Sequence, residues 1–475
     1  MSVAAFAPLG LYPLLIAAAA LLIHVWTNAS PRRCFITGFW FGLGFFGAGV
    51  SWIYVSLHHV GGMPAPVAGL ATLLFCAFLA LFPAVAGWLQ ARIPAHPAAR
   101  ACLLIPAAWT LLEWIRSWIL TGFPWISFGY AAAGWPLQGY APVGGVFFLS
   151  FVTVALGGMA WLVAARHRRP VWAAAFVAIA ALGEGLRHVE WSTPQGEPVS
   201  VALLQGNIEQ SLKFDPARYE RTLETYARLA DASKARLIVF PETAVPRFVD
   251  MVEPQYLEQL AAMARRNGGD VLLGVPTRRT RDEFFNSVLA FGTSRPQVYH
   301  KVHLVPFGEF VPPGLGWTLR MVNIPMSDFS RGRPGQALLE VAGQRVGVNI
   351  CYEDAFGDEI ARQLPAATLL VNVSNVAWFG DSLAPAQHLQ IARLRAIETG
   401  RAYLTATNTG ITAAIDRDGR VTATLAQFTE GRLETSAQGY VGATPYVLWR
   451  DWPAVLGALG ALVAAAVIAR RKVSR

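Results

Sequence analysis

The sequence predicts two kinds of structure in one chain: an α-helical membrane domain and an α/β domain outside the membrane. Three observations support this. Of the 475 residues, 54% are hydrophobic, which is more than is usual for a soluble protein. Many of them gather in segments about long enough to cross a bilayer. Residues 190–450 instead alternate short apolar runs with amphipathic stretches at ordinary charge density.

Seven apolar segments predict the membrane part. Six precede residue 190 and one follows residue 450. We therefore expect a transmembrane domain over residues 1–189, an extramembrane domain over 190–450, and a final helix with a basic tail over 451–475. The segments are 9–27, 34–57, 65–91, 101–120, 143–165, 170–187 and 453–469.

The basic residues beside these segments predict their orientation. The chain has a net charge of +9. The basic residues beside the segments follow the first, third, fifth and seventh segments. The loops at 58–64 and 121–142 carry no Lys or Arg. Because basic loops remain in the cytoplasm, the N-terminus and residues 190–450 are expected on the opposite face. The charge thus indicates topology and argues against a nucleic-acid partner. The residues are Arg32, Arg33, Arg92, Arg100, Arg166, Arg168, Arg169, Arg470, Arg471, Lys472 and Arg475.

Residues 190–450 are predicted to form a layered α/β domain, because strands alternate with helices. An Asp418-Gly419 pair after the last expected strand is typical of a hairpin turn. Residues 308–335 are rich in Gly and Pro and too long for a simple turn, which suggests a lid or membrane-dipping arm. The expected strands are 200–205, 236–240, 271–275, 287–291, 345–350, 368–373, 403–407 and 412–415; the expected helices are 216–233, 254–267, 355–363 and 384–400.

Cys351 is a candidate nucleophile. It follows a strand-like run over 344–350, whereas Cys34, Cys76 and Cys102 lie in or beside apolar segments. A single thiol in an oxidising compartment cannot form an internal disulfide. A thiol at a strand end is typical of a nucleophile, and also of a buried core residue.

Two further residues point to the same chemistry. Glu242 follows a predicted strand, where carboxylates of active sites lie, although such a residue also suits a simple turn. Lys301 lies among apolar residues, where an ammonium can stabilise an oxyanion, although alone it is also typical of a surface lysine.

In the order Glu242, Lys301, Cys351 these residues resemble the catalytic triad of the nitrilase superfamily, whose members fold as an α-β-β-α sandwich. The resemblance implies that the carboxylate is the general base, and that the ammonium lowers the thiol pKa and holds the tetrahedral oxyanion. The thiolate would form an acyl thioester. Supporting roles are implied for Glu309, Tyr352 and Glu353.

Across nearly the whole chain the sequence resembles the apolipoprotein N-acyltransferase family. The runs that carry this resemblance lie at 61–64, 121–125, 303–309, 325–332 and 375–380. It implies that an acyl chain passes from a phospholipid, typically phosphatidylethanolamine, through a Cys351 thioester to the amine of an N-terminal diacylglyceryl-cysteine on an apolipoprotein. The enzyme would lie in the bacterial inner membrane with residues 190–450 in the periplasm. Many members carry an additional N-terminal span, so the family implies eight spans where we count seven. Either the start of this sequence is internal, or this branch of the family is shorter.

Five aromatic residues are candidates for contact with substrate. Phe123 and Trp125 lie in an arginine-free loop that suits either an acyl-chain path or an interfacial aromatic belt. Trp378 and Phe379 suit a contact beside the thiol or plain packing on the sheet. Phe214 stands where the family often has Trp; it keeps the aromatic contact but has no indole donor.

Two further observations concern a charged pair within an apolar segment and the motifs of metal and cofactor sites. Glu113 and Arg116 have the i, i+3 spacing of an intramembrane pair, which we favour over a lipid-headgroup site. No cofactor and no metal are expected, because the histidines lack metal-ligand spacing and no phosphate-binding glycine loop precedes a helix.

Two alternatives to the acyltransferase remain open. A membrane-anchored nitrilase-type amidase would use the same thioester with water in place of an amine, but it would need only one anchor. A non-catalytic membrane scaffold with a nitrilase fold would not need Glu242, Lys301 and Cys351 intact.

Overall fold

The computed structural model describes residues 1–280, 282–311 and 328–473. The central part of the expected lid and the motif residues 325–327 lie outside this range. The chain divides into two compact units. The first comprises Met1–Tyr54, Ala65–Glu190 and Thr444–Arg475, and the second comprises Val55–Pro64 and Trp191–Ala443.

The first unit is helical, since a helix satisfies the backbone polar groups of an apolar segment internally. Four helical runs of the described residues are long and apolar enough to span a membrane: Ala65–Arg92, Pro97–Arg116, Pro136–Ala164 and Arg169–Leu186. Pro31–Gly49 and Trp52–Val60 meet the same criteria together and are bent by 51°. Pro13–Thr27 and Trp452–Val467 are shorter apolar helices at the first and last predicted segments. The figure of seven spans stays a prediction.

The helices of this unit are connected by short helical turns. The elements are η1 (Ser2–Ala5), α1 (Pro13–Thr27), α2 (Pro31–Gly49), α3 (Trp52–Val55), α4 (Ala65–Arg92), α5 (Pro97–Ala99), η3 (Arg100–Leu104), α6 (Ile105–Arg116), η4 (Ile119–Thr121), η5 (Phe128–Ala132), η6 (Pro136–Tyr140), α7 (Ala141–Ala164), α8 (Arg169–Leu186), α13 (Pro445–Trp449) and α14 (Trp452–Val473).

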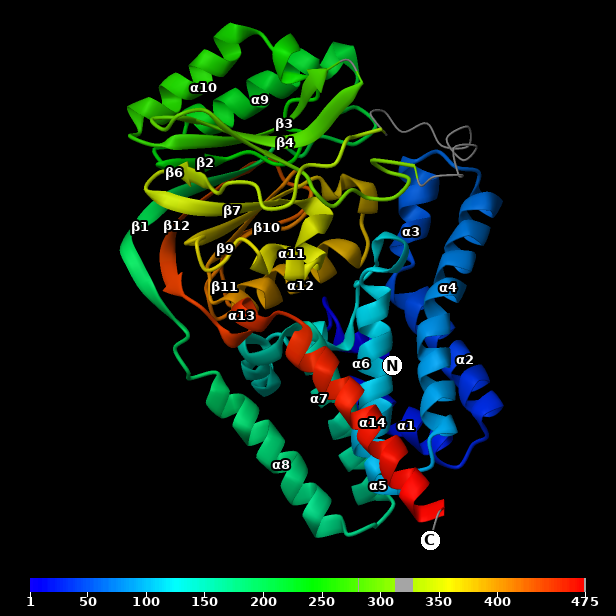
Figure 1. The fold of residues 1–475 in the computed structure, drawn as a ribbon. Helices are drawn as coiled ribbons and strands as arrows, with labels where there is room; N and C mark the ends of the chain where they lie inside the picture. Colours follow the sequence, from blue (N-terminus) through cyan, green and yellow to red (C-terminus); the bar gives the residue numbers. More distant parts are fainter. Residues whose placement is uncertain (281, 312–327, 474–475) are drawn as a thin grey trace. The chain divides into compact units, whose positions relative to one another are not determined.

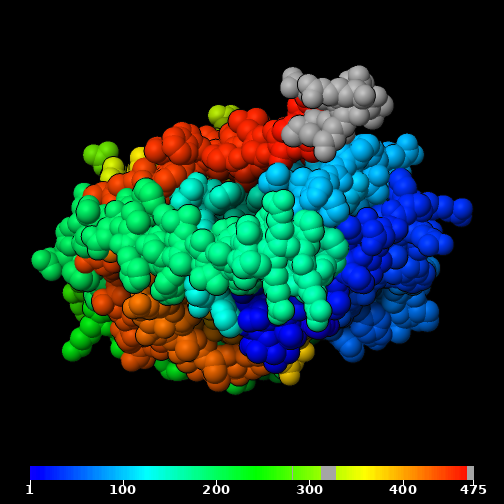
Figure 2. Space-filling model, turned by 90° about the horizontal axis from the view of Figure 1, so that it is seen from below, coloured from blue at the N-terminus to red at the C-terminus, as the bar shows by residue number. Residues whose placement is uncertain are grey.

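Packing differs sharply between helices of this unit. Between α2 and α4 the backbones approach closely, since a Cβ on Gly38 would lie 2.6 Å from the Pro83 carbonyl oxygen. Helix α8 instead leaves Val171, Val177 and Leu182 exposed. Figure 2 shows this helix, in teal-green, along the surface of the molecule. An apolar helix exposed in this way suits contact with lipid.

The second unit is an α-β-β-α sandwich, which confirms the predicted fold class. One six-stranded sheet has the order β12-β1-β2-β3-β4-β5 and the other β11-β10-β9-β8-β7-β6. Helices α9 and α10 cover the outer face of the first sheet, and α11 and α12 cover that of the second (Figure 1). The pairs β1–β2, β2–β3, β7–β8 and β8–β9 are parallel.

The elements of this unit follow the predicted alternation. The strands are β1 (Ser192–Gln205), β2 (Leu237–Val239), β3 (Asp270–Thr280), β4 (Glu283–Gly292), β5 (Gln297–His300), β6 (Leu339–Val341), β7 (Gln344–Ile350), β8 (Leu369–Ser374), β9 (Tyr403–Thr407), β10 (Thr412–Ile415), β11 (Val421–Leu425) and β12 (Gly431–Gly442). The helices are η2 (Ser56–Val60), η7 (Pro216–Arg218), α9 (Tyr219–Asp231), η8 (Val249–Met251), α10 (Pro254–Arg266), η10 (Cys351–Ala355), α11 (Gly357–Ala361), η11 (Val376–Phe379) and α12 (Ala384–Thr399).

Periodic apolar residues explain the helices over the first sheet. Leu223 and Tyr226 of α9 and Leu260 of α10 are buried against Ile238 of β2 and Leu273 of β3. This spacing is that of an amphipathic helix with one face on a core. These contacts hold β2 and β3 in place, and the candidate base follows β2.

Several predicted boundaries were wrong. The expected helix 216–233 is divided into η7 and α9, and the expected helix 355–363 is only the short α11, preceded by the turn η10. Strand β1 begins eight residues early because its exposed first half pairs with β12. The strands β5, β6, β11 and β12 were not predicted, since they are short or largely exposed and owe their form to ladder pairing.

Candidate active site

The three predicted catalytic residues follow the ends of strands from both sheets. Glu242 comes after β2 and Lys301 directly after β5 in the first sheet, while Cys351 directly follows β7 in the second. All three are buried, with side-chain charges that act on one another. The sandwich therefore brings together residues that lie as much as 109 positions apart in the sequence, between Glu242 and Cys351.

Glu242 is surrounded by hydrogen-bond donors. Its Oε1 accepts from Asn286 Nδ2 at 2.7 Å and from Lys301 Nζ at 3.3 Å, and its Oε2 accepts from the backbone N–H of Asn375 at 2.7 Å. Burial raises the pKa of this carboxyl, but Lys301, Lys213 and these donors outweigh burial and lower the pKa below its usual value. Glu242 is therefore ionised and able to accept a proton.

Lys301 joins two carboxylates. Its Nζ lies 2.9 Å from Oε1 and 2.8 Å from Oε2 of Glu309, besides its contact with Glu242. Burial lowers the pKa of this ammonium, but Glu242 and Glu309 raise it to a net value well above the usual range. Glu309 Oε2 also accepts from Val305 N at 2.9 Å. The predicted support of Lys301 by Glu309 thus has a direct contact as its basis.

Cys351 lies at a strained turn between β7 and η10. Its φ is +54°, in the left-handed region that non-glycine residues seldom adopt. Burial, followed by the charge of Glu242, raises the pKa of the thiol, and Lys301 offsets this only in part. Lys301 therefore acts in the predicted direction, but the net pKa is raised and the resting thiol is protonated.

Glu353 ties the cysteine turn to the strand that bears the lysine. Its carboxylate accepts from Ile350 N at 2.6 Å, Val302 N at 2.6 Å and His303 N at 3.0 Å. The Tyr299 hydroxyl donates to both oxygens at 3.2 and 3.1 Å. We call these contacts the Glu353 clamp. Tyr352, the other predicted neighbour, is buried against the rings of His303 and Phe356.

Two residues of the site were missed by the sequence analysis. Asn286 of β4 bridges Glu242 and Glu309, with Nδ2 at 2.7 and 2.8 Å from their oxygens. Lys213 is buried, and its Nζ donates to the backbone oxygen of Glu242 at 3.0 Å. Asn286 lies one residue before the strand predicted over 287–291, and that strand begins earlier in the structure, at Glu283. The sequence around Lys213 gave no signal for a buried lysine.

The aromatic candidates of the second unit lie on loops beside these residues. Phe214, next to Lys213, is partly buried. Trp378 and Phe379 form the end of η11, which begins just after Asn375. The Trp378 backbone oxygen accepts from Ser56 Oγ at 2.8 Å. The turn that contacts Glu242 through Asn375 is thus also bound to η2. The roles of these aromatics in substrate binding stay predictions.

Trp125 and Phe123 belong to the first unit. Trp125 is almost fully buried, with its ring against those of Trp52 and Phe123. Arg116 donates to the backbone oxygens of Phe123 and Trp125, and Glu113 Oε1 accepts from Phe128 N at 3.0 Å. Both charged residues of α6 therefore hold this loop in place.

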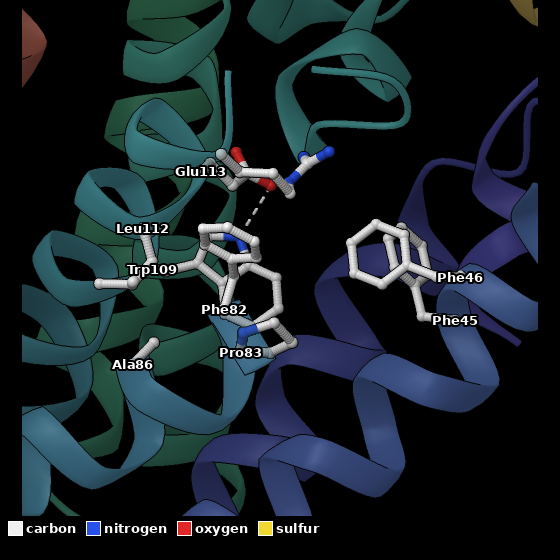
Figure 3. Close-up of a pocket in the computed structure, with 9 residues that line it drawn as sticks. Phe45, Phe46, Phe82, Pro83, Ala86, Trp109, Leu112 and Glu113 are labelled. Atoms are coloured by element: carbon white, nitrogen blue, oxygen red, sulfur yellow. Dashed lines mark hydrogen bonds between the residues drawn. The ribbon is translucent and has the colours of Figure 1, made fainter. Parts of the chain in front are cut away.

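A cleft in the same unit has Glu113 at one end. It is lined by aromatic side chains together with this carboxylate and Arg116. Figure 3 shows Glu113 beside Trp109, whose Nε1 donates to it at 3.0 Å, with Phe45 and Phe46 across the cleft.

Of the described residues, no group of three or more His, Cys, Asp or Glu is arranged to hold a metal ion.

Comparison with known proteins covers nearly the whole chain. Residues 1–159 match the family model described as apolipoprotein N-acyltransferase N-terminal domain, and residues 200–446 match that of carbon-nitrogen hydrolase. A relative from Nitrosomonas europaea named apolipoprotein N-acyltransferase is 48% identical over 454 residues, or 94% of this chain and 91% of that protein. One of the same name from Methylococcus capsulatus is 44% identical, over 95% of this chain and 91% of that protein.

Solved structures of carbon-nitrogen hydrolases match about half of the chain. A carbon-nitrogen hydrolase from Helicobacter pylori is 18% identical, covering 55% of this chain and 94% of its own, with a TM-score of 0.37. The full-length relatives and the two family models carry the assignment. The chain belongs to the apolipoprotein N-acyltransferase family, a membrane-embedded branch of the nitrilase superfamily, and is a multi-pass membrane acyltransferase.

Proposed function

We propose that this enzyme moves an acyl chain from a phospholipid to the N-terminal amine of a diacylglyceryl-cysteine on an apolipoprotein, with Cys351 as the carrier. The observation that supports this most directly is the buried Glu242–Lys301–Cys351 group in a chain with several apolar helices. A nucleophile, a base and a fixed cation suffice for acyl transfer through a thioester. The membrane part suits two substrates that are both anchored in a bilayer.

The first half-reaction forms the thioester. Glu242 takes the proton of Cys351 as Sγ attacks the carbonyl carbon of the sn-1 ester, and Lys301 stabilises the oxyanion that forms. The tetrahedral intermediate then collapses, and the bond between the carbonyl carbon and the glycerol oxygen breaks. Glu242 returns its proton to that oxygen, so that a lysophospholipid leaves and the acyl chain remains on Cys351.

The second half-reaction forms the amide. Glu242 removes a proton from the incoming α-amine as its nitrogen attacks the thioester carbonyl. The carbon–sulfur bond breaks, and the thiolate recovers the proton from Glu242. The product is the triacylated lipoprotein. We infer that phosphatidylethanolamine is the donor, and that the enzyme lies in the bacterial inner membrane with residues 190–450 in the periplasm.

Incubation of the purified protein with phospholipid labelled in its sn-1 chain tests this proposal. We expect mass spectrometry to find the label on the Cys351 peptide, and a diacylated lipopeptide with a free N-terminus to remove it as an amide. Cys351→Ala should take no label. A wild-type protein that acquires no label would refute the thioester. Release of the label as free fatty acid, with the lipopeptide unchanged, would favour the amidase-type alternative.

A further inference from the structure

Lys213 is a buried lysine whose position demands an explanation. It lies in the loop between β1 and η7, with its side chain only 4% exposed. Burying an ammonium is costly unless it is paired or hydrogen-bonded. Its Nζ donates to the backbone oxygen of Glu242 at 3.0 Å. The lysine thus meets the catalytic base from the backbone side, whereas Lys301 meets it at the carboxylate.

Lys213 adds a second buried positive charge beside the carboxylates of the site. Glu242 and Glu309 are two buried carboxylates, and both contact Lys301. Lys213 supplies the second positive charge, which acts on Glu242 and on Cys351. Transfer of the Cys351 proton to Glu242 moves a negative charge from one to the other without changing the sum. Without Lys213, the thiolate and Glu309 would share Lys301 alone.

We propose that Lys213 is a positioning residue of the active site, which holds the Glu242 backbone in place and balances the negative charge that forms on Cys351 during acyl transfer. The proposal rests on the proposed function and adds a second cation to it. Lys301 and Lys213 would then divide the work. Lys301 binds the carboxylates and the oxyanion, while Lys213 holds the backbone of the base and stabilises the thiolate by its charge.

The protonation of Lys213 makes the proposal specific. Burial lowers the pKa of this lysine to about 8, although Glu242 and Cys351 counteract the shift. The site should therefore lose one positive charge as the pH rises through about 8. An arginine in this place stays charged to much higher pH. Lys301, whose own pKa is raised by Glu242 and Glu309, stays protonated throughout this range.

Alkylation of Cys351 by iodoacetamide tests the proposal without any lipid. The rate follows the thiolate fraction, and loss of a nearby cation raises a thiol pKa by about one unit or more. At pH 7 we therefore expect Lys213→Met to react about tenfold more slowly at Cys351 than the wild type. The Cys351 peptide is followed by mass spectrometry. Lys213→Arg should react at nearly the wild-type rate, and so should Lys234→Met, which replaces an exposed lysine.

The outcomes separate this inference from the proposed function. Wild-type reactivity in a folded Lys213→Met protein would overturn the role of Lys213. If that variant does not fold, the pH dependence of acyl transfer by Lys213→Arg decides. Activity of Lys213→Arg that persists above pH 8, where the wild type loses activity, supports the role. A loss of activity at the same alkaline pH in Lys213→Arg and in the wild type refutes the role. If the wild type takes no acyl label but Lys213→Met still slows alkylation, the proposed function fails while the second cation remains.

Discussion

The proton on Cys351 decides how this site works at the scale of single residues. Burial and the Glu242 charge raise the pKa of the thiol, whereas the Glu242 carboxyl has a lowered pKa. The resting site therefore holds a thiol and a carboxylate rather than a thiolate and a carboxylic acid. In the proposed mechanism, the nucleophile would form when the proton moves to Glu242 during attack. Lys301 is already fixed by two carboxylates, so it need not rearrange to meet the new charge.

Glu242→Gln should be far more harmful to acylation than Glu309→Gln. The first change removes the proton acceptor, and general bases contribute about 10²- to 10⁴-fold to rates. The second removes a partner of Lys301 but leaves the base in place, so we expect a loss at least about tenfold smaller. Single-turnover acylation from labelled phospholipid measures both. Equal losses would contradict the assignment of Glu242 as base and Glu309 as support.

Asn286→Leu should move the acid limb of acylation to higher pH. Asn286 donates to Glu242 and Glu309, and a hydrogen bond to a charged group contributes about 1.5–3 kcal/mol. Its loss should therefore raise the pKa of Glu242 relative to the wild type. Glu242 can act as a base only when it is ionised, which requires a pH above its pKa. As the pH falls through that pKa, acylation activity is lost. The variant, with the higher pKa, should therefore lose activity at a higher pH than the wild type.

The matched control for this change is Asn267→Leu. The Asn267 amide donates to the carbonyl oxygens of Ser233 and Ala235, outside the site. Its removal costs hydrogen bonds but should leave the acid limb where it is in the wild type. An acid limb that is the same in Asn286→Leu and the wild type would show that Asn286 does not tune the base.

At the scale of elements, the site is assembled from strand ends. Strands β5, β7 and β8 each have a residue of the site directly after their last position, namely Lys301, Cys351 and Asn375, and Glu242 lies three residues after the end of β2. The Glu353 clamp joins the end of β7 to the segment after β5 by hydrogen bonds. We therefore expect it to hold Cys351 and Lys301 at a fixed separation. A buried carboxylate that accepts from several backbone N–H groups makes such a junction rigid. Any movement that left one of these N–H groups without an acceptor would cost free energy.

Glu353→Gln should loosen this junction. The amide replaces one acceptor oxygen by a donor that faces backbone N–H groups, and each buried donor left unpaired costs about 1–3 kcal/mol. We expect a lower melting temperature and slower alkylation of Cys351, whereas Glu340→Gln, at an exposed position of β6, should change neither. Melting in detergent and iodoacetamide labelling give the two readouts. An unchanged alkylation rate would mean that the clamp does not position the thiol.

The elements that were predictable are those with an apolar pattern. Strand β9 was predicted with its true bounds, and α10 to within one residue, because their buried faces follow the periods of a strand and a helix. Strands β5 and β12 escaped prediction because their stability comes from neighbours in the ladder. Glu242, Lys301 and Cys351 were predicted from motifs, and their catalytic roles stay predictions. Lys213 was not predicted, since its burial depends on a backbone oxygen 29 residues away.

At the scale of the whole molecule, the arginines and the apolar helices predict one orientation. Arg32 and Arg33 lie at the start of α2, Arg92 at the end of α4 and Arg100 at the start of η3. By the positive-inside rule, we expect these turns in the cytoplasm. With the predicted seven spans, an even number of crossings would separate such turns from one another, and an odd number would separate them from residues 190–450. The catalytic residues would then face the periplasm, where lipoproteins that have crossed the membrane expose their N-termini.

Single cysteines test this orientation in intact cells. Lys234 and Arg32 are both exposed, the first in the second unit and the second at the start of α2. The four native cysteines are buried, so a membrane-impermeant maleimide should react mainly with the introduced thiol. We expect Lys234→Cys to be labelled once the outer membrane is permeable. Arg32→Cys should be labelled only after the inner membrane is broken, because the positive-inside rule predicts that α1 ends on the cytoplasmic side. The reverse pattern would place the catalytic unit in the cytoplasm, away from exported lipoproteins, and would rule out the proposed acceptor even if Cys351 carries an acyl chain.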